Sequence, residues 1–515
     1  MPDTRQVGLW GEREHLERKA ETKRAAKFQS RDPREIFVGS KRLDEYLTEN
    51  EAGWVVRLRE ELERVDFSML EKAYGDQGRR PFHPRVMVGL IVYGMLIRQW
   101  SLRELQNLAV RDVGAWFICG GHQPDHSTLG KFLVLHRETL GDEFFASLTR
   151  QLVMRLGTQG KVAAIDGTVI EAASRRFRLL KAEAVREIAR EAVAAAGEKP
   201  DDEALGRKAR EAQAVAEIVT AREQKRKAKG RKSEATVVPE EQEAVMQPRK
   251  DGVARPSYKP SVLVDETGLI LAQRVDPSSE TAVVSTLLDR AASATGRAVE
   301  TALMDAGYFS VAILRTSVER DLDVLCPPGK THGSTWDRAG PTGLFGKSRF
   351  AFDEENNVYR CPAGQAMASF KKGTEYGLNY QRYATKACGT CPLKSQCTKG
   401  AGRSIKRYEG DDLKDAMLSV FNQPAARAVY QRRQIIVEPI FAELRERQGL
   451  RRFHRRGLSG VRLEFSLHCI ALNLKRTMAG IAVRLSLVFV WSVRFGTAQL
   501  VLAVFSLSRE PGGQF

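Results

Sequence analysis

The sequence lacks the features of a membrane-bound or exported protein. Near its C-terminus the apolar runs LSLVFVWSV and QLVLAVFSL are nine residues each, whereas a helix needs roughly 20 residues to span a bilayer. The first residues, MPDTRQVGLWGEREHLERKAETKR, are polar and charged and contain no apolar core of an export signal. The seven cysteines are an odd number, which argues against a disulfide framework. We therefore expect a cytoplasmic protein without membrane contact.

Acidic residues are also in deficit. The chain of 515 residues has 64 Asp and Glu against 82 Lys and Arg, a net charge of +18. A charge of this sign and size indicates a polyanionic partner, most simply nucleic acid, so we expect the protein to be nucleoid-associated. An anionic membrane surface is the alternative, but the basic residues are spread over several segments rather than one amphipathic helix.

Apolar and polar residues alternate in both helical and strand patterns along the chain, which predicts an α/β (mixed) fold. We expect a flexible charged arm at 1–50, a helical domain at 51–157, the first part of an α/β core at 158–330, a Cys-rich insertion at 331–420, the last part of the core at 421–480 and an apolar C-terminal extension at 481–515. Within the core, residues 170–257 read as a helical basic insertion and a proline-containing linker.

The segment 51–157 contains short helices with recognisable starts. Pro84 is placed at the first turn of one helix, Ser101 and Glu104 form a capping box, and Ser127 is a good N-cap. Short helices joined by tight polar turns are consistent with a helix-turn-helix DNA reader. A helical bundle that does not bind DNA has the same pattern, so this alternative stays open.

The core has the order β–β–β–α–β–α–β, which favours a mixed sheet over a doubly wound fold or an all-β sandwich. Asp265 to Gly268 predicts a hairpin turn between two of these strands. Residues 331–420 are expected to be irregular, and LEFSLHCIALNLKRTMAGI is expected to form a helix that packs on the sheet.

Asp166 and Asp305 each end a short apolar run and are followed within two residues by glycine, in AAIDGT and ALMDAGY. A carboxylate at the end of a strand, beside a glycine that permits a sharp turn, is where α/β sheets place active sites. Each motif alone more often marks an ordinary turn. Together they suggest a carboxylate pair for a hard cation such as Mg²⁺.

Residues 424–457 predict a long helix with a basic tail, holding nine Arg, no Lys and three Glu. At 100° per residue, Arg427, Gln431, Gln434 and Arg445 lie within about 40° of Glu438 on one face. A carboxylate on such a face suits a group that holds a cation over a phosphate backbone. An exposed amphipathic helix with a scattered Glu is the alternative interpretation.

These motifs resemble a known family. DGTVIEAAS, MDAGYFS and EPIFAELR followed by FHRRG are similar to the three signatures of DDE transposases from bacterial insertion sequences. The branch it resembles joins a helical N-terminal domain, similar to HPRVMVGLIVYGMLIRQWSLRELQNL and GGHQPDHSTLGKF, to a catalytic domain with a Cys-rich insertion. The sequence departs from the family in two places. Arg445 stands where a Lys is common, and the spacing from Tyr430 and Arg433 to Glu438 is one residue longer than in the family.

The resemblance implies an RNase H-like catalytic domain in which Asp166, Asp305 and Glu438 bind two Mg²⁺ (or Mn²⁺) ions. It implies double-stranded DNA as partner, both element ends and target, and no small-molecule substrate. We expect a homodimer in the active complex. The phosphate contacts expected are Arg433, Arg445, Arg451, Arg452, Arg455 and Arg456.

The function implied is a transposase that binds terminal inverted repeats and catalyses metal-dependent strand cleavage and strand transfer. A catalytically silent DNA-binding regulator derived from a transposase is one alternative. A metal-dependent nuclease without joining activity is another.

Four of the cysteines, spaced C-x26-C-x2-C-x5-C, are Cys361, Cys388, Cys391 and Cys397. Four thiolates with one C-x2-C pair suit a structural Zn²⁺ ion. Reduced structural cysteines or a redox pair are the alternatives. Cys119, Cys326 and Cys469 lie in apolar surroundings and are expected in the core.

Overall fold

The computed structural model describes residues 28–29, 31–75, 80–174, 179–228, 234–249, 251–328, 344–375 and 378–495, with side chains up to Met478. Most of the expected N-terminal arm and the apolar run QLVLAVFSL lie outside these residues. The chain divides into two compact units, the first comprising 1–158, 442–451 and 462–515 and the second 159–441 and 452–461. Both helices and sheets occur, which confirms the mixed α/β class. Within the described ranges, no helix combines the length and apolarity needed to cross a bilayer.

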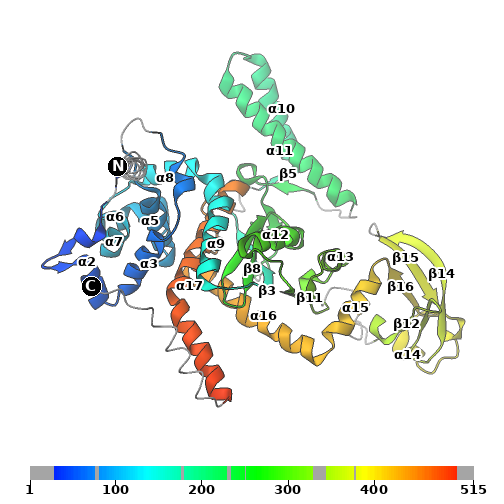
Figure 1. Ribbon diagram of the computed structural model, residues 1–515. Coiled ribbons are helices and arrows are strands. Elements are labelled where there is room, and N and C mark those ends of the chain that lie inside the picture. The colour runs from blue at the N-terminus through cyan, green and yellow to red at the C-terminus, as the bar shows by residue number, and fades with distance from the viewer. Residues whose placement is uncertain are drawn as a thin grey trace, which may run out of the picture. The chain divides into compact units, whose positions relative to one another are not determined.

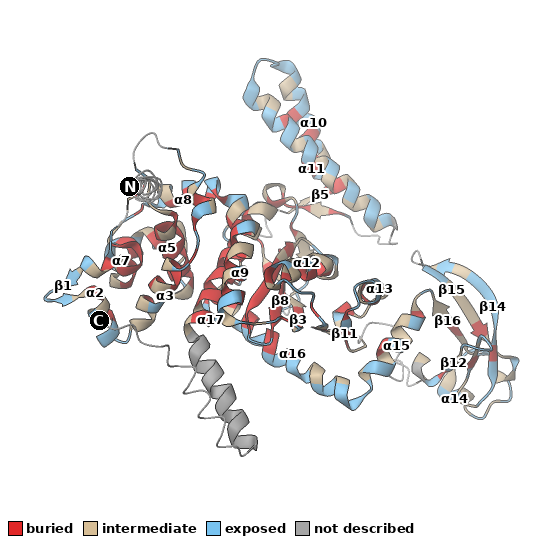
Figure 2. Ribbon diagram, viewed as in Figure 1, coloured by how far each residue is buried: buried red, intermediate tan, exposed pale blue. Residues whose placement is uncertain are grey.

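The first unit is helical. Its helices include α2 (Leu43–Glu49), α3 (Gly53–Glu63), α4 (Ser68–Glu71), α5 (Pro84–Leu96), α6 (Leu102–Arg111), α7 (Val113–Cys119), α8 (His126–Leu135) and α9 (Phe144–Leu156). Because its sequence PRVMVGLIVYGML is almost wholly apolar, α5 is buried from Val86 to Met95 and forms the centre of this unit (Figure 2). Pro84 occupies the first turn, as expected, and His83 is the N-cap.

Two further helix starts in this unit can be compared with their sequence signals. The capping box of Ser101 and Glu104 at the start of α6 is confirmed. The start of α8 was placed wrongly, because Asp125 rather than Ser127 is the N-cap and accepts from the Thr128 backbone N–H. The side-chain oxygen of Gln106 on α6 accepts from the His126 backbone N–H at 3.0 Å, so the two helices are joined where α8 begins.

The end of the chain completes the first unit. From Arg462 onward, α17 (Gly457–Phe495) clusters with the N-terminal helices, whereas we expected this helix to pack on the sheet. The Ser466 hydroxyl donates to the Leu140 carbonyl at 2.7 Å. The Trp100 indole N–H donates to the Gln448 carbonyl at 3.2 Å, and its ring stands edge-on to His468. Buried polar partners thus fix the returning helix, which an apolar pattern alone does not reveal.

The second unit is built on a seven-stranded sheet (Figure 1). Its strands are β3 (Val162–Gly167), β4 (Ile170–Glu171), β7 (Val245–Gln247), β8 (Arg255–Asp265), β9 (Ile270–Asp276), β10 (Thr301–Met304) and β11 (Asp323–Leu325). β3, β10 and β11 are parallel neighbours, while β8 runs antiparallel to β3 and pairs with β9. With α12 (Val284–Thr295) and α13 (Val311–Glu319), the order β3–β8–β9–α12–β10–α13–β11 agrees with the predicted order of elements, to which the structure adds β4 and β7 between β3 and β8.

A helical hairpin interrupts the sheet between β4 and β7. It consists of α10 (Ala182–Glu198) and α11 (Glu203–Ala228), closed by the two-stranded ladder of β5 (Leu180–Lys181) and β6 (Thr236–Val237). Its own small core includes Val185, Val219 and Val237. The linker expected up to residue 257 is wrong in part, because β7 and the start of β8 already belong to the sheet. The prolines of this segment predicted a linker, but Pro256 lies within β8, opposite Met246 of β7.

The Cys-rich insertion is a sheet rather than the irregular segment that we expected. Its strands β12 (Ala351–Asp353), β13 (Val358–Arg360), β14 (Ala366–Glu375), β15 (Leu378–Ala384) and β16 (Ser404–Tyr408) form an antiparallel meander. Few of its residues are buried, and its core is mainly aromatic, with Phe350, Tyr359 and Tyr383. Polar strands carry little hydrophobic alternation, so the pattern missed them. α15 (Asp411–Phe421) and α16 (Pro424–Ala442) follow.

Candidate active site

Asp166 and Asp305 lie at corresponding positions on neighbouring parallel strands. Ile165 of β3 is in register with Met304 of β10, and each aspartate is the next residue. The sheet therefore places the two side chains at one edge, as the sequence predicted. Asp305 is also the N-cap of the turn η6 (Ala306–Tyr308).

Backbone N–H groups orient both carboxylates. Gly167 N–H donates to Asp166 Oδ1, and Gly307 N–H donates to Asp305 Oδ1, each at 2.8 Å. The buried thiol of Cys326 donates to the Asp305 carbonyl at 2.9 Å and fixes the backbone there. One oxygen of each aspartate is thus held by its own turn, and the other is available to a further partner.

Arg433 is the partner of Asp166. Its Nη2 lies 2.8 Å from Asp166 Oδ2, and the two side chains are only 11% and 18% exposed. Burial raises the pKa of Asp166 to about 6; Arg433 and the Gly167 N–H oppose this, while Asp305 and Glu280 add to it. The desolvation of a carboxylate between two other acids therefore outweighs one guanidinium. Arg433 was expected to contact DNA phosphate, and the structure places it against an acid instead.

Glu280 is an acid of this site that sequence reasoning missed. It follows β9 and precedes the turn η5 (Thr281–Val283). A Cβ at Gly167 would lie 2.5 Å from Glu280 Cγ, so the Glu280 side chain crosses directly over the Gly167 backbone. Lys259 Nζ lies 3.3 Å from its carboxylate. The available signal was an acid just after a third apolar strand, without the glycine that marks the other two.

Glu438 lies elsewhere on its helix. α16 buries Arg433, Ile436, Val437 and Ile440, while Glu438 is exposed. Val437, four residues after Arg433, shares its face, and Glu438 is a further 100° around the axis. The structure thus brings Asp166 and Asp305 together and turns Arg433 rather than Glu438 toward them.

Tyr430 belongs to the same face of α16 as Arg433. Burial raises the pKa of its hydroxyl, Arg433 lowers it, and Cys326, Asp305 and Asp166 raise it further. The hydroxyl therefore lies within electrostatic reach of both aspartates. The pair Tyr430 and Arg433, one helical turn apart, forms the wall of the site that faces the strand ends.

The other arginines expected at phosphates have varied surroundings. Arg452 donates from Nε to the Ala172 carbonyl at 3.0 Å and also binds the Ala173 carbonyl, so it holds the chain after β4. Arg451 pairs with Glu446. Arg456 is exposed, and Arg445 and Arg455 are partly buried.

The four cysteines of the insertion line one small cavity beside Phe345 and Phe350. All four are free and partly buried. Burial raises the pKa of the Cys397 thiol, Arg403 opposes this, and the other three thiols add to it, so the four sulfurs are near neighbours. Their chemistry suits Zn²⁺.

To bind a metal ion, the carboxylates at the strand ends and the four thiols of the insertion would each have to move closer together. Over the described part of the chain, no three His, Cys, Asp or Glu side chains are gathered closely enough to hold an ion. The donors themselves fit: carboxylates for Mg²⁺ and thiols for Zn²⁺. At the strand ends, the Arg433 guanidinium occupies the oxygen of Asp166 that a cation would take.

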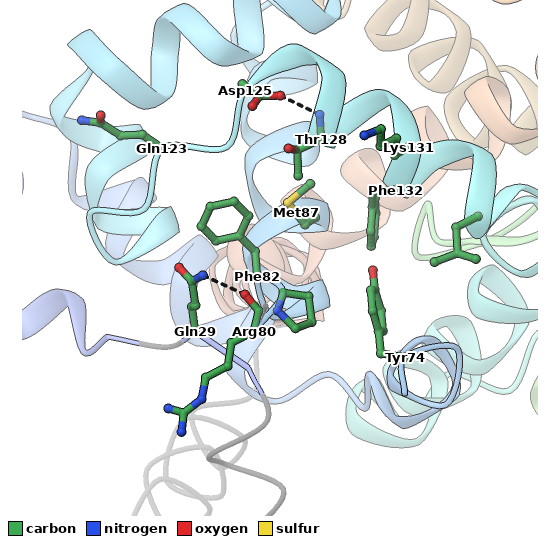
Figure 3. A pocket seen from close by; sticks show the side chains of 12 residues that line it. Gln29, Tyr74, Arg80, Phe82, Met87, Gln123, Asp125, Thr128, Lys131 and Phe132 are labelled. Carbon is green, nitrogen blue, oxygen red and sulfur yellow. Dashed lines mark hydrogen bonds between the residues drawn. The ribbon is translucent and has the colours of Figure 1, made fainter. Parts of the chain in front are cut away.

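A larger cavity of about 470 Å³ lies in the helical unit. Figure 3 shows its lining, in which Asp125 binds the Thr128 N–H and Gln29 binds the Arg80 carbonyl. Asp125 is the carboxylate of this lining and is engaged as a helix cap. The cavity therefore offers no acid pair, and the candidate active site remains at the ends of β3 and β10.

Comparison with protein families gives two matches. A family described as transposase DDE domain matches residues 360–478, and a transposase domain (DUF772) matches residues 41–134. No curated protein matches the chain. Together the two matches support the assignment of the chain to the DDE transposases of insertion sequences, the family its motifs resemble. A transposase DDE domain implies a transposition enzyme in general terms.

Proposed function

We propose that this transposase binds the terminal inverted repeats of its element, cleaves the DNA ends and joins the freed 3′-hydroxyls to a target. The observation that carries the proposal is the pairing of Asp166 and Asp305 at adjacent parallel strand ends in a chain with two transposase-family matches. Parallel β3, β10 and β11 beside antiparallel β8 and β9 support an RNase H-like core. Residues 51–157 are proposed to bind the DNA ends, with a homodimer as the active form.

Asp166 and Asp305 would hold Mg²⁺ or Mn²⁺ through the oxygens that their backbone turns leave available. When bound, a pair of such ions supplies activation of the attacking water or 3′-hydroxyl and charge stabilisation at the leaving oxygen. Gly167 and Gly307 N–H groups fix the carboxylate orientation beforehand. Arg433 neutralises the buried Asp166 carboxylate, and a bound cation would supply the same compensation.

Substitution of Asp166→Asn tests this function. The side chain keeps its shape but loses its charge, so we expect cleavage and strand transfer to fall by at least about a thousandfold, since metal-held chemistry depends on the carboxylate. Binding to DNA that carries the element ends should remain within about twofold of wild type because Asp166 is not expected to contact DNA.

The assay uses end-containing DNA with Mg²⁺, and a pre-cut end with a target plasmid. A variant that still cuts would refute the role of Asp166. Cutting by the wild type without joined product indicates the nuclease alternative, and end binding without cutting indicates the silent regulator.

We also propose that Cys361, Cys388, Cys391 and Cys397 hold a structural Zn²⁺ ion. The purified chain should then contain about one zinc, and Cys388→Ser with Cys391→Ser should remove it. Cys119→Ser is the matched control because Cys119 is buried in the helical unit. Zinc content unchanged by the double substitution would contradict the site.

A further inference from the structure

The antiparallel sheet of the Cys-rich insertion carries basic and aromatic side chains on one face. Arg382 of β15 lies opposite both Lys371 of β14 and Lys406 of β16, so three basic residues form a row across three strands. In the next row, Tyr380 of β15 lies opposite Tyr408 of β16. Paired residues of neighbouring strands, and residues two apart along one strand, share a face of a sheet. These five residues therefore form one surface, which we call the aromatic–basic face.

The opposite face of the same sheet carries the core of the insertion. Tyr383 of β15 and Ile405 of β16 are paired there and are 1% and 3% exposed. They alternate with Arg382 and Lys406 along their strands, so the aromatic–basic face points away from this core. Most residues of β14, including Lys371, are exposed, and the other four residues of the face are half-buried (Figure 2). Over the described part of the chain, the aromatic–basic face is thus accessible to a partner.

The ring of Tyr380 lies across the backbone of Gly373. These two residues are paired between β14 and β15, and a Cβ at Gly373 would lie 2.8 Å from Tyr380 Oη and 2.9 Å from Tyr380 Cζ. A glycine at this strand position therefore leaves room for a ring that lies along the sheet. The Tyr408 ring is its neighbour, with centroids 5.7 Å apart and ring planes at 59°. Two neighbouring rings on an accessible sheet face offer a surface on which planar groups such as nucleic-acid bases can stack.

The charge of this face is positive. Its acid is Glu375 of β14, which pairs with Lys406 at 2.5 Å. Arg382 donates from Nε to the Ser404 hydroxyl at 2.9 Å, which leaves its charge uncompensated and its other N–H groups directed to no acid of the described chain. Lys371 is exposed and likewise pairs with no acid among the described residues. Two positive charges beside two aromatic rings suit an anionic partner that also has flat, apolar surfaces.

Single-stranded nucleic acid has both properties, because it combines planar bases with an anionic backbone. In a duplex the bases are stacked on one another and present only their edges in the grooves, so they do not lie on protein rings. Both family matches are to transposase domains, and one of them covers this sheet from residue 360 onward. The partner that fits the chemistry of the face and the class of the protein is therefore single-stranded DNA.

We propose that the aromatic–basic face of the insertion binds single-stranded DNA. Bases stack on Tyr380 and Tyr408, and Lys371 and Arg382 contact phosphates. Binding is largely independent of base sequence, since every base has a face that can stack. This inference goes beyond the proposed function, which places the binding of the DNA ends in residues 51–157, and it does not depend on the acids at the ends of β3 and β10.

The test is binding of the full chain to a labelled oligodeoxyuridylate, measured by fluorescence anisotropy without added Mg²⁺. We expect Tyr380→Ala to weaken binding at least about fivefold, as the loss of one stacked base does. Tyr380→Phe keeps the ring and should stay within about twofold of wild type. This pair of variants separates stacking from the tyrosine hydroxyl.

A second measurement addresses the phosphate contacts. Lys371→Gln should reduce the slope of log affinity against log salt concentration by about 0.7, the value for one phosphate of a single strand. Lys372→Gln is the matched control, because Lys372 is the next residue, is also exposed, and lies on the opposite face of β14. Its slope should equal that of wild type.

The proposal is overturned if the wild type does not bind the oligodeoxyuridylate, or if Tyr380→Ala binds it as tightly as wild type. Tighter binding of the matching oligouridylate, which differs by its 2′-hydroxyls, would overturn the assignment to DNA. Should Tyr380→Ala not fold, the lysine variants decide. A slope reduced only in Lys371→Gln supports the face, whereas an unchanged slope, or equal reductions in both variants, overturns it.

The outcome is separable from that of the proposed function. Asp166→Asn should bind the oligodeoxyuridylate within about twofold of wild type, because Asp166 lies at the end of β3 in the other sheet. Loss of cleavage in Asp166→Asn with unchanged single-strand binding supports both. Cleavage by a wild type that does not bind the oligodeoxyuridylate overturns only the aromatic–basic face.

Discussion

Asp166 is a buried carboxylate whose negative charge is repelled by Asp305 and Glu280 and attracted by Arg433. Its pKa of about 6 leaves it mostly ionised at neutral pH, and the ion pair with Arg433 weakens as the pH falls below that value. Gly167 allows this crowding, because only a residue without Cβ lets the Glu280 side chain pass over the backbone. The glycine therefore serves close approach rather than a turn.

Gly167→Ala tests this close approach. The added methyl would lie 2.5 Å from Glu280 Cγ and must displace it, so we expect a loss of about 1–3 kcal/mol in the free energy of unfolding, as for overpacking in a core. Gly197→Ala is the control, since Gly197 lies in α10 with no atom within 4 Å of the added Cβ. It should be neutral or slightly stabilising. Chemical denaturation measures both, and equal stabilities would contradict the crowding.

The sequence predicted the acids of the site correctly where an apolar strand ends in an aspartate that a glycine follows. Asp166 and Asp305 were identified from apolar runs followed by Gly, and the parallel register places them together. Glu280 was missed because no glycine follows it, and its contact with Gly167 spans more than a hundred residues. The role of Glu438 stays a prediction. Helical periodicity shows which residues of α16 share a face, but it does not show which face packs against the sheet.

At the scale of elements, helix starts follow local chemistry. α5 begins at Pro84 after His83, whose Nδ1 accepts from the Arg85 N–H at 3.0 Å. The Nε2 atom lies 3.1 Å from Glu71, so the neutral ring can cap the helix with one nitrogen and donate with the other. Burial, Arg85 and Arg59 lower the pKa of His83 to about 4. The helix cap therefore requires the neutral imidazole.

This cap predicts a pH dependence of stability. Because the folded pKa lies below the ordinary 6.5, the stabilisation is complete above pH 6.5 and is lost as the pH falls toward 4. The total is about 3 kcal/mol for a shift of this size. His83→Asn keeps a capping side chain that does not titrate. The difference in unfolding free energy between wild type and variant should shrink between pH 7 and pH 4.5; a constant difference would refute the linkage.

The strands β3, β8, β9, β10 and β11 of the main sheet were predictable because they are apolar and bounded by clear turns, such as Asp265 to Gly268. Those of the Cys-rich insertion were not. Arg407 lies over the Phe352 ring at 3.8 Å and Lys406 over Tyr380 at 4.8 Å, so basic residues cover aromatic ones. Such strands are stabilised by cross-strand pairs, which depend on a register that a single sequence does not display.

At the scale of the whole molecule, the net charge of +18 sets how DNA binding should respond to salt. The logarithm of the affinity should fall linearly with the logarithm of salt concentration, with a slope of about −0.9 for each phosphate neutralised. Arg456→Gln, which removes an exposed arginine, should reduce the slope by about one unit. Arg452→Gln is the control, since its guanidinium binds backbone carbonyls.

Fluorescence anisotropy at several salt concentrations gives these slopes. A reduced slope for Arg452→Gln and an unchanged slope for Arg456→Gln would show that the phosphate contacts are assigned the wrong way round.

The return of α17 to the first unit affects how the protein is made. Trp100 and the Leu140 carbonyl find their partners in Gln448, His468 and Ser466, more than three hundred residues later in synthesis. While the ribosome translates the second unit, Trp100 and the Leu140 carbonyl of the N-terminal helices have not yet met these partners. The sheet of the second unit can meanwhile form, since its strands are complete by Leu325. Translation that stops before residue 442 would leave the first unit without residues 442–451 and without its part of α17.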